Sequence, residues 1–90
     1  MQTALKFSEA NFDNILQGKR YTIRKGLREV HVGEIPLIAD HTERMTIASV
    51  FHVSLQPFES LMGDYSKDGL MEHYPDLLDT DIVTLIKFKI

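Results

Sequence analysis

The chain has 90 residues, of which 43% are hydrophobic and 26% are charged, with a formal net charge of −3 and no cysteine. This size and composition predict a single domain over residues 1–90 and exclude a disordered chain, a disulfide scaffold and a cysteine–zinc site, and the lack of cysteine weakly favours a cytoplasmic protein. No apolar run approaches the roughly 18 residues of a membrane-spanning helix, and the N-terminus lacks a signal-peptide pattern, so we expect no membrane partner.

A short strand and a short helix are the first elements expected along the chain. Residues 3–7 have the composition of a strand, and Ser8 follows with a side chain suited to a helix N-cap. Phe7 and Phe12 have the spacing of a hydrophobic staple at the start of a helix. We therefore predict a helix over residues 9–17, followed by a glycine suited to its C-terminal end.

Three strands are expected next. "YTIRK" (21–25) and "EIPLIA" (34–39) are the first two, and "MTIASVFHVSL" (45–55) is the third. The third segment is long enough to bend around a small barrel. Its alternating pattern predicts a single buried face, formed by Met45, Ile47, Phe51, Val53 and Leu55.

The remaining elements are two short helices and a final strand. Pro57 suits the first position of a helix over 57–62, and a second helix is expected over 66–73. The final strand covers 80–90, with a buried face formed by Ile82, Thr84, Ile86, Phe88 and Ile90. Five strands with short helices between them favour an α+β fold built on a small β-barrel, because a doubly wound parallel sheet needs a helix after nearly every strand.

Positive charge is concentrated around the strand at 21–25, although the chain is acidic. Residues 1–33 contain six Lys/Arg and three Asp/Glu, whereas residues 34–90 contain four and ten. A general nucleic-acid coat protein would be basic overall, so this chain can offer only a local basic patch. The pairs Lys19-Arg20 and Arg24-Lys25 form that patch.

Thr22 and Arg24 are two residues apart in this strand, so their side chains leave the same face. Lys19 lies three residues before Thr22 and can fold back over that face. A threonine hydroxyl becomes a nucleophile when a base takes its proton, and burial beside arginines favours the neutral form of a lysine that could act as this base. Arg24 could instead clamp a carbonyl oxygen, a base edge or a phosphate. The structural alternative is that all three are ordinary surface and strand residues.

Patterns for metals and cofactors are not found in the sequence. There is no GxGxxG or Walker loop, so we expect no cofactor. We also expect no metal site, because no metal-ligand spacing connects the four histidines, His31, His41, His52 and His73.

The stretch "ILQGKRYTIRKGLREVHVGEIPLI" (15–38), followed by "DIVTLIKF" (81–88), resembles the ASCH family of small β-barrels related to PUA domains. Members characteristically carry a helix ending in glycine, a lysine, a Thr-x-Arg strand and a Val-Gly-Asp/Glu turn. The matching residues are Gly18, Lys19, Thr22, Arg24 and Val32-Gly33-Glu34. The resemblance implies a β-barrel around a cleft that binds RNA or a modified nucleoside.

One branch of this family resembles amidohydrolases that remove the acetyl group from N4-acetylcytidine, using a lysine base, a threonine nucleophile three residues later and a distal glutamate acid. Lys19 and Thr22 match the first two at the same spacing. The family's acid precedes a helix that leads to a Tyr-Pro pair, which this chain has at 74–75. Either Asp68 or Glu59 could take the role of the acid.

Three hypotheses follow for the function. The leading one is an ASCH-type domain that binds RNA or a modified nucleoside, with Arg20, Tyr21 and Arg24 as candidate ligand-binding residues. The second is an N4-acetylcytidine amidohydrolase, and the third is a regulatory interaction module without chemistry. A carboxylate close to Lys19 and Thr22 would favour the enzyme, whereas a cleft floored by Tyr21 and Arg24 would favour binding. The oligomeric state is left open.

Overall fold

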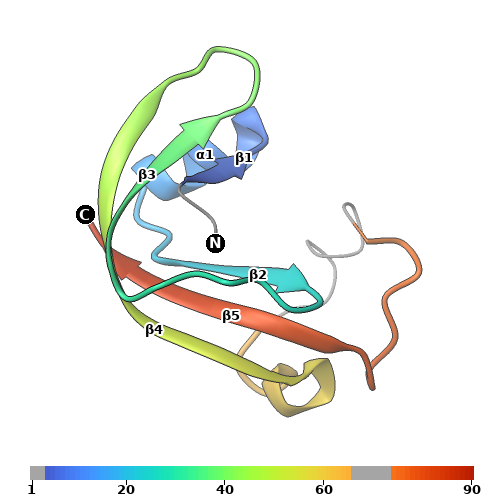
Figure 1. The fold of residues 1–90 in the computed structure, drawn as a ribbon. Helices are drawn as coiled ribbons and strands as arrows, with labels where there is room; N and C mark the ends of the chain where they lie inside the picture. Colours follow the sequence, from blue (N-terminus) through green and yellow to red (C-terminus); the bar gives the residue numbers. More distant parts are fainter. Residues whose placement is uncertain (1–3, 66–73) are drawn as a thin grey trace.

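A strongly curved sheet of five strands, accompanied by one α-helix, forms the body of the protein (Figure 1). The computed structural model describes residues 4–65 and 74–90. Its elements are β1 (Leu5–Phe7), α1 (Glu9–Leu16), β2 (Tyr21–Lys25), β3 (Gly33–Ala39), β4 (Met45–Pro57), the 3-10 helix η1 (Phe58–Leu61) and β5 (Ile82–Lys89). The predicted α+β class with five strands is therefore confirmed as a half-barrel sheet with one α-helix. The short helix predicted over 66–73 lies outside the described residues.

The strand order in the sheet is β1-β3-β4-β5-β2. β1 pairs with β3 in parallel, and every other neighbouring pair is antiparallel. The long strand β4 takes part in both halves of the sheet, because its first part pairs with β3 and its second part with β5. β1 and β2 are consequently the two edge strands, and the curvature of the sheet turns both toward the same open side (Figure 1).

The helix α1 begins and ends as the sequence predicts. The Ser8 hydroxyl accepts a hydrogen bond of 3.3 Å from the Asn11 amide, which satisfies one of the free N–H groups of the first turn. Phe12 and Ile15 are buried against the sheet. Gly18 follows the helix with φ of 129°, a backbone conformation that glycine adopts without a steric cost.

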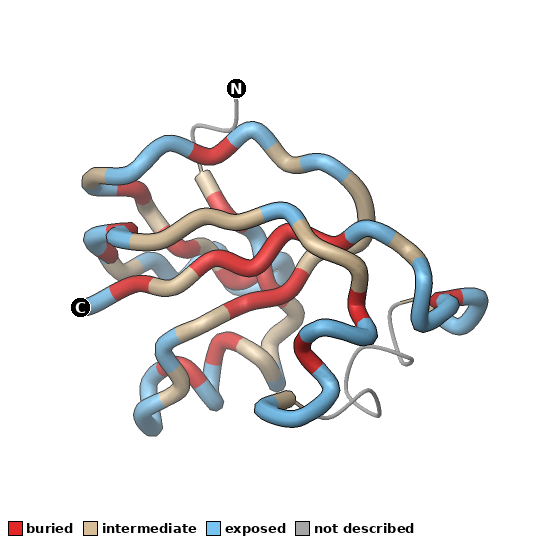
Figure 2. Tube along the Cα trace, turned by 90° about the horizontal axis from the view of Figure 1, so that it is seen from below, coloured by how far each residue is buried: buried red, intermediate tan, exposed pale blue. Residues whose placement is uncertain are grey.

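Buried apolar residues form two clusters, one on each side of β5. On one side, Ile86 and Phe88 join the cluster that contains α1, β1 and β3. On the other side, Val83 and Leu85 pack with η1 and with the loop around Leu77. Figure 2 accordingly shows the strand leading to the C-terminus as buried over most of its length. The predicted buried face of this strand is confirmed for its middle residues, whereas its end residues Ile82 and Ile90 are exposed.

The predicted buried face of β4 is wrong. Met45, Ile47, Phe51 and Leu55 are each about half exposed, while Ala48 and Val50 are buried. A β-bulge explains the difference in the first half of the strand: Val50 pairs with Phe88, but His52 rather than Phe51 pairs with the next residue, Lys87. Even-numbered residues therefore face inward before the bulge, and Val53 packs against the inner cluster after it. A prediction that continues the alternation of inward and outward side chains through the bulge therefore assigns the first half of β4 to the wrong face of the sheet.

Within the part of the chain that the structure describes, no helix is both long enough and apolar enough to cross a lipid bilayer.

Candidate functional site

Two of the basic side chains around β2 are engaged in holding the fold together. The Nη1 atom of Arg20 donates hydrogen bonds to the carbonyl oxygens of Ile15 at 2.7 Å and Lys19 at 3.0 Å, so this side chain satisfies carbonyl groups at the end of α1. The Nζ atom of Lys25 lies 3.7 Å from the carboxylate of Asp81. Arg20, a candidate ligand-binding residue from the sequence, thus has a structural function in the described chain.

Arg24 and Thr22 lie together on one face of β2, as the sequence predicts. The Nε atom of Arg24 donates a hydrogen bond of 3.1 Å to the Thr22 hydroxyl oxygen. Its Nη2 atom donates another, of 2.8 Å, to the Lys6 carbonyl, and its guanidinium lies 4.8 Å from the centre of the Phe7 ring. Thr22 is only 6% exposed. Burial lowers the pKa of Arg24, so the charge of this side chain is carried in a partly dry environment.

Lys19 lies with Tyr21 rather than with Thr22. Its ammonium is 5.0 Å from the centre of the Tyr21 ring, which in turn lies 4.6 Å from the Tyr65 ring at an interplanar angle of 56°. The described residues give no contact between the Lys19 ammonium and the Thr22 hydroxyl, so the predicted position of Lys19 over the face of Thr22 stays a prediction. Burial and, to a smaller extent, the charge of Arg24 lower the pKa of Lys19.

One side of the β2 backbone has no strand partner. The Arg20 carbonyl accepts a hydrogen bond of 3.0 Å from the Phe88 amide. In this register the backbone N–H and C=O groups of the even-numbered residues of β2 point toward β5. The N–H and C=O groups of Tyr21 and Ile23 therefore face the edge of the sheet that has no strand partner, where Ile23 is 7% exposed and Tyr21 is half-buried. No backbone group in residues 4–65 and 74–90 pairs with them.

Of the two predicted acids, the structure describes Glu59 alone. Glu59 is an exposed residue of η1, and its backbone N–H donates a hydrogen bond of 2.8 Å to the Asp79 carbonyl. Its carboxylate makes no hydrogen bond or ion pair with Lys19 or Thr22 among the residues described here. Asp68 lies outside those residues. The described chain thus provides the cations and the hydroxyl group of the predicted site, but no acid.

A carboxylate that the sequence analysis did not single out holds the loop between β3 and β4. The Glu9 carboxylate accepts hydrogen bonds from the His41 amide at 3.1 Å, the Thr42 amide at 3.3 Å and the Thr42 hydroxyl at 2.9 Å. Arg44 donates to both Glu9 and Asp13. Desolvation raises the pKa of Glu9, but the hydrogen bonds from these partners together outweigh it and hold the pKa at about 2. No local sequence pattern predicts this network, because the loop follows the helix by about thirty residues.

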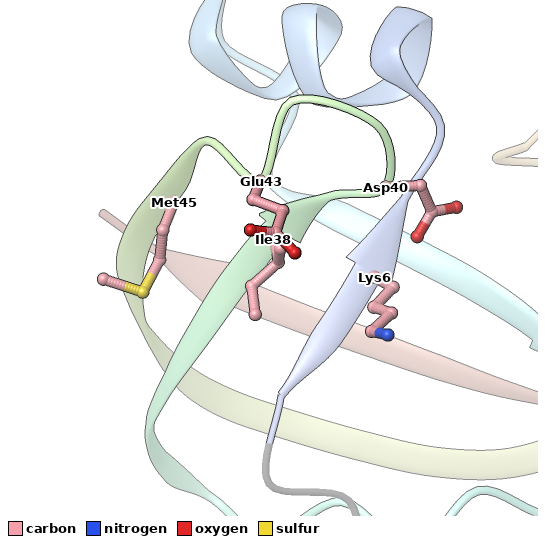
Figure 3. A pocket seen from close by; sticks show the side chains of 5 residues that line it. All are labelled: Lys6, Ile38, Asp40, Glu43 and Met45. Carbon is pink, nitrogen blue, oxygen red and sulfur yellow. The ribbon is translucent and has the colours of Figure 1, made fainter.

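A shallow pocket of 390 Å³ lies at β1, β3, the start of β4 and the loop between β3 and β4 (Figure 3). Its lining residues are Lys6, Ile38, Asp40, Glu43 and Met45. Glu43 occupies the loop between β3 and β4 with φ of 56°, an unusual conformation for a residue with a side chain. The histidines and acids of residues 4–65 and 74–90 do not form a group of three that could hold a metal ion.

Comparisons of the chain with protein-family models, with curated proteins and with solved structures found no match. The resemblance to the ASCH family therefore rests on the motif residues alone. Around those residues the structure shows a half-barrel whose edge strand β2 carries Thr22 and Arg24, with Lys19 two residues before the strand begins.

Proposed function

We propose that the chain is an ASCH-type, PUA-like domain that binds RNA or a modified nucleoside along the open edge of β2. The observation that carries this proposal is the backbone of Tyr21 and Ile23, which has no backbone partner in residues 4–65 and 74–90 and is flanked by the half-buried cations Lys19 and Arg24. A nucleobase offers hydrogen-bond donors and acceptors along its edge, and a phosphate offers anionic oxygens. The backbone groups of β2 could therefore pair with the base edge, and the two cations could bind the phosphate.

The charges around the edge favour an anionic or oxygen-rich ligand. Burial lowers the pKa of Lys19, and the charge of Arg24 lowers it further, so the two cations repel each other. In the part of the chain that the structure describes, the Lys19 ammonium has an aromatic neighbour but no hydrogen-bond acceptor. A phosphate or a carbonyl oxygen would supply that acceptor and offset the repulsion between the cations.

The Tyr21 and Tyr65 rings add an aromatic surface beside the same edge. Single-stranded RNA and free nucleosides expose the faces of their bases, which stack on tyrosine rings. The acidic remainder of the chain disfavours general adhesion to nucleic acid, because most of its surface repels phosphate. Recognition would therefore depend on the β2 edge rather than on the overall charge.

Fluorescence anisotropy with a labelled single-stranded oligoribonucleotide, together with calorimetry with N4-acetylcytidine, tests the proposal. Lys19→Gln removes the cation at the edge. Lys89→Gln is a matched control, because Lys89 also lies over an aromatic ring, that of Phe51 at 5.6 Å, but on another part of the sheet. We expect Lys19→Gln to weaken RNA binding about ten-fold or more, which is the usual loss for a charge-assisted hydrogen bond. We also expect it to reduce the magnitude of the salt slope by about 0.7, the value for one phosphate contact on a single strand.

Equal losses in Lys19→Gln and Lys89→Gln would show that only net charge matters. If the wild-type protein binds neither the oligoribonucleotide nor N4-acetylcytidine, the proposal is wrong.

A second function, hydrolysis of the N4-acetyl amide of cytidine, is favoured by two observations. The Arg24 guanidinium donates to the Thr22 hydroxyl oxygen, which would stabilise an alkoxide there, and the pKa of Lys19 is lowered. Thr22 would attack the acetyl carbonyl while Lys19 takes its proton, and Glu59 or Asp68 would protonate the cytidine amine as it leaves. Water would then hydrolyse the acyl-threonine to acetate. The Lys19 ammonium must first move from the Tyr21 ring to the Thr22 hydroxyl.

Release of cytidine from N4-acetylcytidine distinguishes the two functions. Thr22→Val removes the hydroxyl group but keeps the shape of the side chain, so it should abolish turnover and leave RNA binding within about two-fold. Thr22→Ser keeps a hydroxyl group and should retain part of the turnover. If the wild-type protein releases no cytidine but binds RNA, the chain is a binding domain and not an amidohydrolase.

A further inference from the structure

The first half of β4 exposes an apolar strip on the outside of the sheet. Met45 is 60% exposed, Ile47 is 48% exposed and Phe51 is 52% exposed. Ile38 of β3 pairs with Met45 across the two strands and extends the strip. We call these four residues the outer strip. In Figure 1, α1 lies inside the curve of β3 and β4, and no described helix covers the outside of that curve.

A row of large apolar side chains on one sheet face is a feature of interaction surfaces, because isolated soluble domains rarely expose a contiguous apolar patch. We propose that the outer strip is the interface through which two copies of this chain form a two-fold symmetric dimer. This proposal is independent of the ligand-binding edge at β2.

The charges at one end of the outer strip are mainly acidic. The pocket next to Met45 carries the carboxylates of Asp40 and Glu43 and one cation, Lys6 (Figure 3). Figure 3 shows these side chains on the same side of the sheet as Ile38 and Met45. No ion pair within 4 Å joins Lys6 to either acid in the described residues. The formal charges of these three pocket residues therefore sum to −1.

The charges at the other end of the outer strip are mainly basic. Ser49 pairs with Glu34 on one side and with Lys89 on the other, so these two residues flank the strip near Phe51. Lys87 is two residues before Lys89 in β5, and its side chain leaves the same face. This end therefore carries the two cations Lys87 and Lys89 and the one carboxylate of Glu34. The two ends of the outer strip carry opposite net charges.

This arrangement is complementary to a second copy of itself. A two-fold axis through the middle of the outer strip would place the acidic end of each copy against the basic end of the other. It would also bring Phe51 of each copy to the pocket of the other, where Ile38 and Met45 provide an apolar floor. A buried aromatic side chain in a pocket is the usual anchor of an interface. A partner of uniform charge, such as nucleic acid, would match only one end.

Sedimentation velocity over a range of protein concentrations tests the dimer. Phe51→Ser should raise the dimer dissociation constant at least ten-fold but change thermal stability little at a concentration where the protein is monomeric, because Phe51 is 52% exposed in a single chain. Leu55→Ser is the matched control, since Leu55 lies in the same strand and is also 52% exposed, but lies beyond the bulge and outside the outer strip. We expect this control to dimerise like the wild-type protein.

Charge exchange tests the relative orientation of the two copies. Glu43→Lys and Lys89→Glu should each weaken the dimer, and the double variant should recover most of the lost affinity, because each contact is then remade with reversed signs. A wild-type protein that stays monomeric at every concentration would overturn the proposal. So would a dimer that survives Phe51→Ser, or one that Leu55→Ser disrupts equally.

Discussion

The guanidinium of Arg24 in β2 donates a hydrogen bond of 2.8 Å to the backbone carbonyl of Lys6 in β1. These two strands are the opposite ends of the sheet order, so a single side chain connects the edges that the half-barrel leaves open. The same guanidinium also holds the Thr22 hydroxyl and covers the Phe7 ring. Arg24 therefore stabilises the fold in addition to any function in ligand binding.

Replacement of Arg24 should reveal this stabilising function. We expect Arg24→Lys to lower the free energy of unfolding by about 1.5–3 kcal/mol, because a lysine cannot hold the Thr22 hydroxyl and the Lys6 carbonyl together. Lys25→Ala should cost less than about 1 kcal/mol, since it breaks only a partly exposed ion pair with Asp81. Urea unfolding measures both. Equal stability of Arg24→Lys and the wild-type protein would show that the connection to β1 contributes nothing.

The bulge in β4 leads to opposite predictions for two phenylalanines. Phe88 is fully buried, so Phe88→Ala should cost roughly 3–5 kcal/mol, a large part of the stability of a domain of this size. Phe51 is 52% exposed, so Phe51→Ala should cost less than about 1 kcal/mol. Denaturant unfolding at a concentration where the protein is monomeric provides the comparison. A large cost at Phe51 would mean that the outer face of β4 is covered in the single chain.

Acid should weaken the network around Glu9. Its pKa is about 2 in the folded protein against 4.5 for the free group, so the folded state favours the carboxylate. The stabilisation is complete above pH 4.5 and is lost progressively as the pH falls toward 2. We expect the advantage of the wild-type protein over Glu9→Gln, measured by urea unfolding, to shrink across this range. An advantage that does not change with pH would show that the folded state does not favour the ionised form.

Alkaline pH should have the opposite effect at Lys19. Burial and the charge of Arg24 lower its pKa below 10.5, so in the window between the folded and the unfolded pKa the unfolded chain binds more protons. Stability therefore rises with pH in that window. At pH 7 we expect Lys19→Met to be at least as stable as the wild-type protein, and we expect the wild-type protein to gain on it as the pH approaches 10.5. A difference that stays constant over this range would contradict the lowered pKa.

The elements that the sequence predicts well are those with local signals. The Ser8 cap, the Phe7–Phe12 spacing and Gly18 define α1 within a residue of its observed ends. The strand around Thr22 and the shared face of Thr22 and Arg24 follow from simple alternation. These features depend on residues that are close in sequence, so a short window contains the information they need.

The features that the sequence does not predict depend on distant residues. The bulge after Val50 is set by the register between β4 and β5, which no window around residue 50 reveals. The Lys19 ammonium lies 5.0 Å from the centre of the Tyr21 ring, a side-chain contact that residue spacing does not specify. The Glu9 network and the opposite charges at the ends of the outer strip both join separate parts of the chain.

Chemical-shift mapping of the backbone amides tests the ligand-binding edge most directly. ¹⁵N-labelled protein is titrated with a single-stranded oligoribonucleotide and, separately, with N4-acetylcytidine. We predict the largest saturable shifts at the amides of Tyr21 and Ile23, which face the open edge of β2, with smaller shifts at Thr22, whose amide faces β5. Shifts confined to the outer face of β4, or no saturable shifts at Tyr21 and Ile23 with either ligand, would contradict binding at this edge.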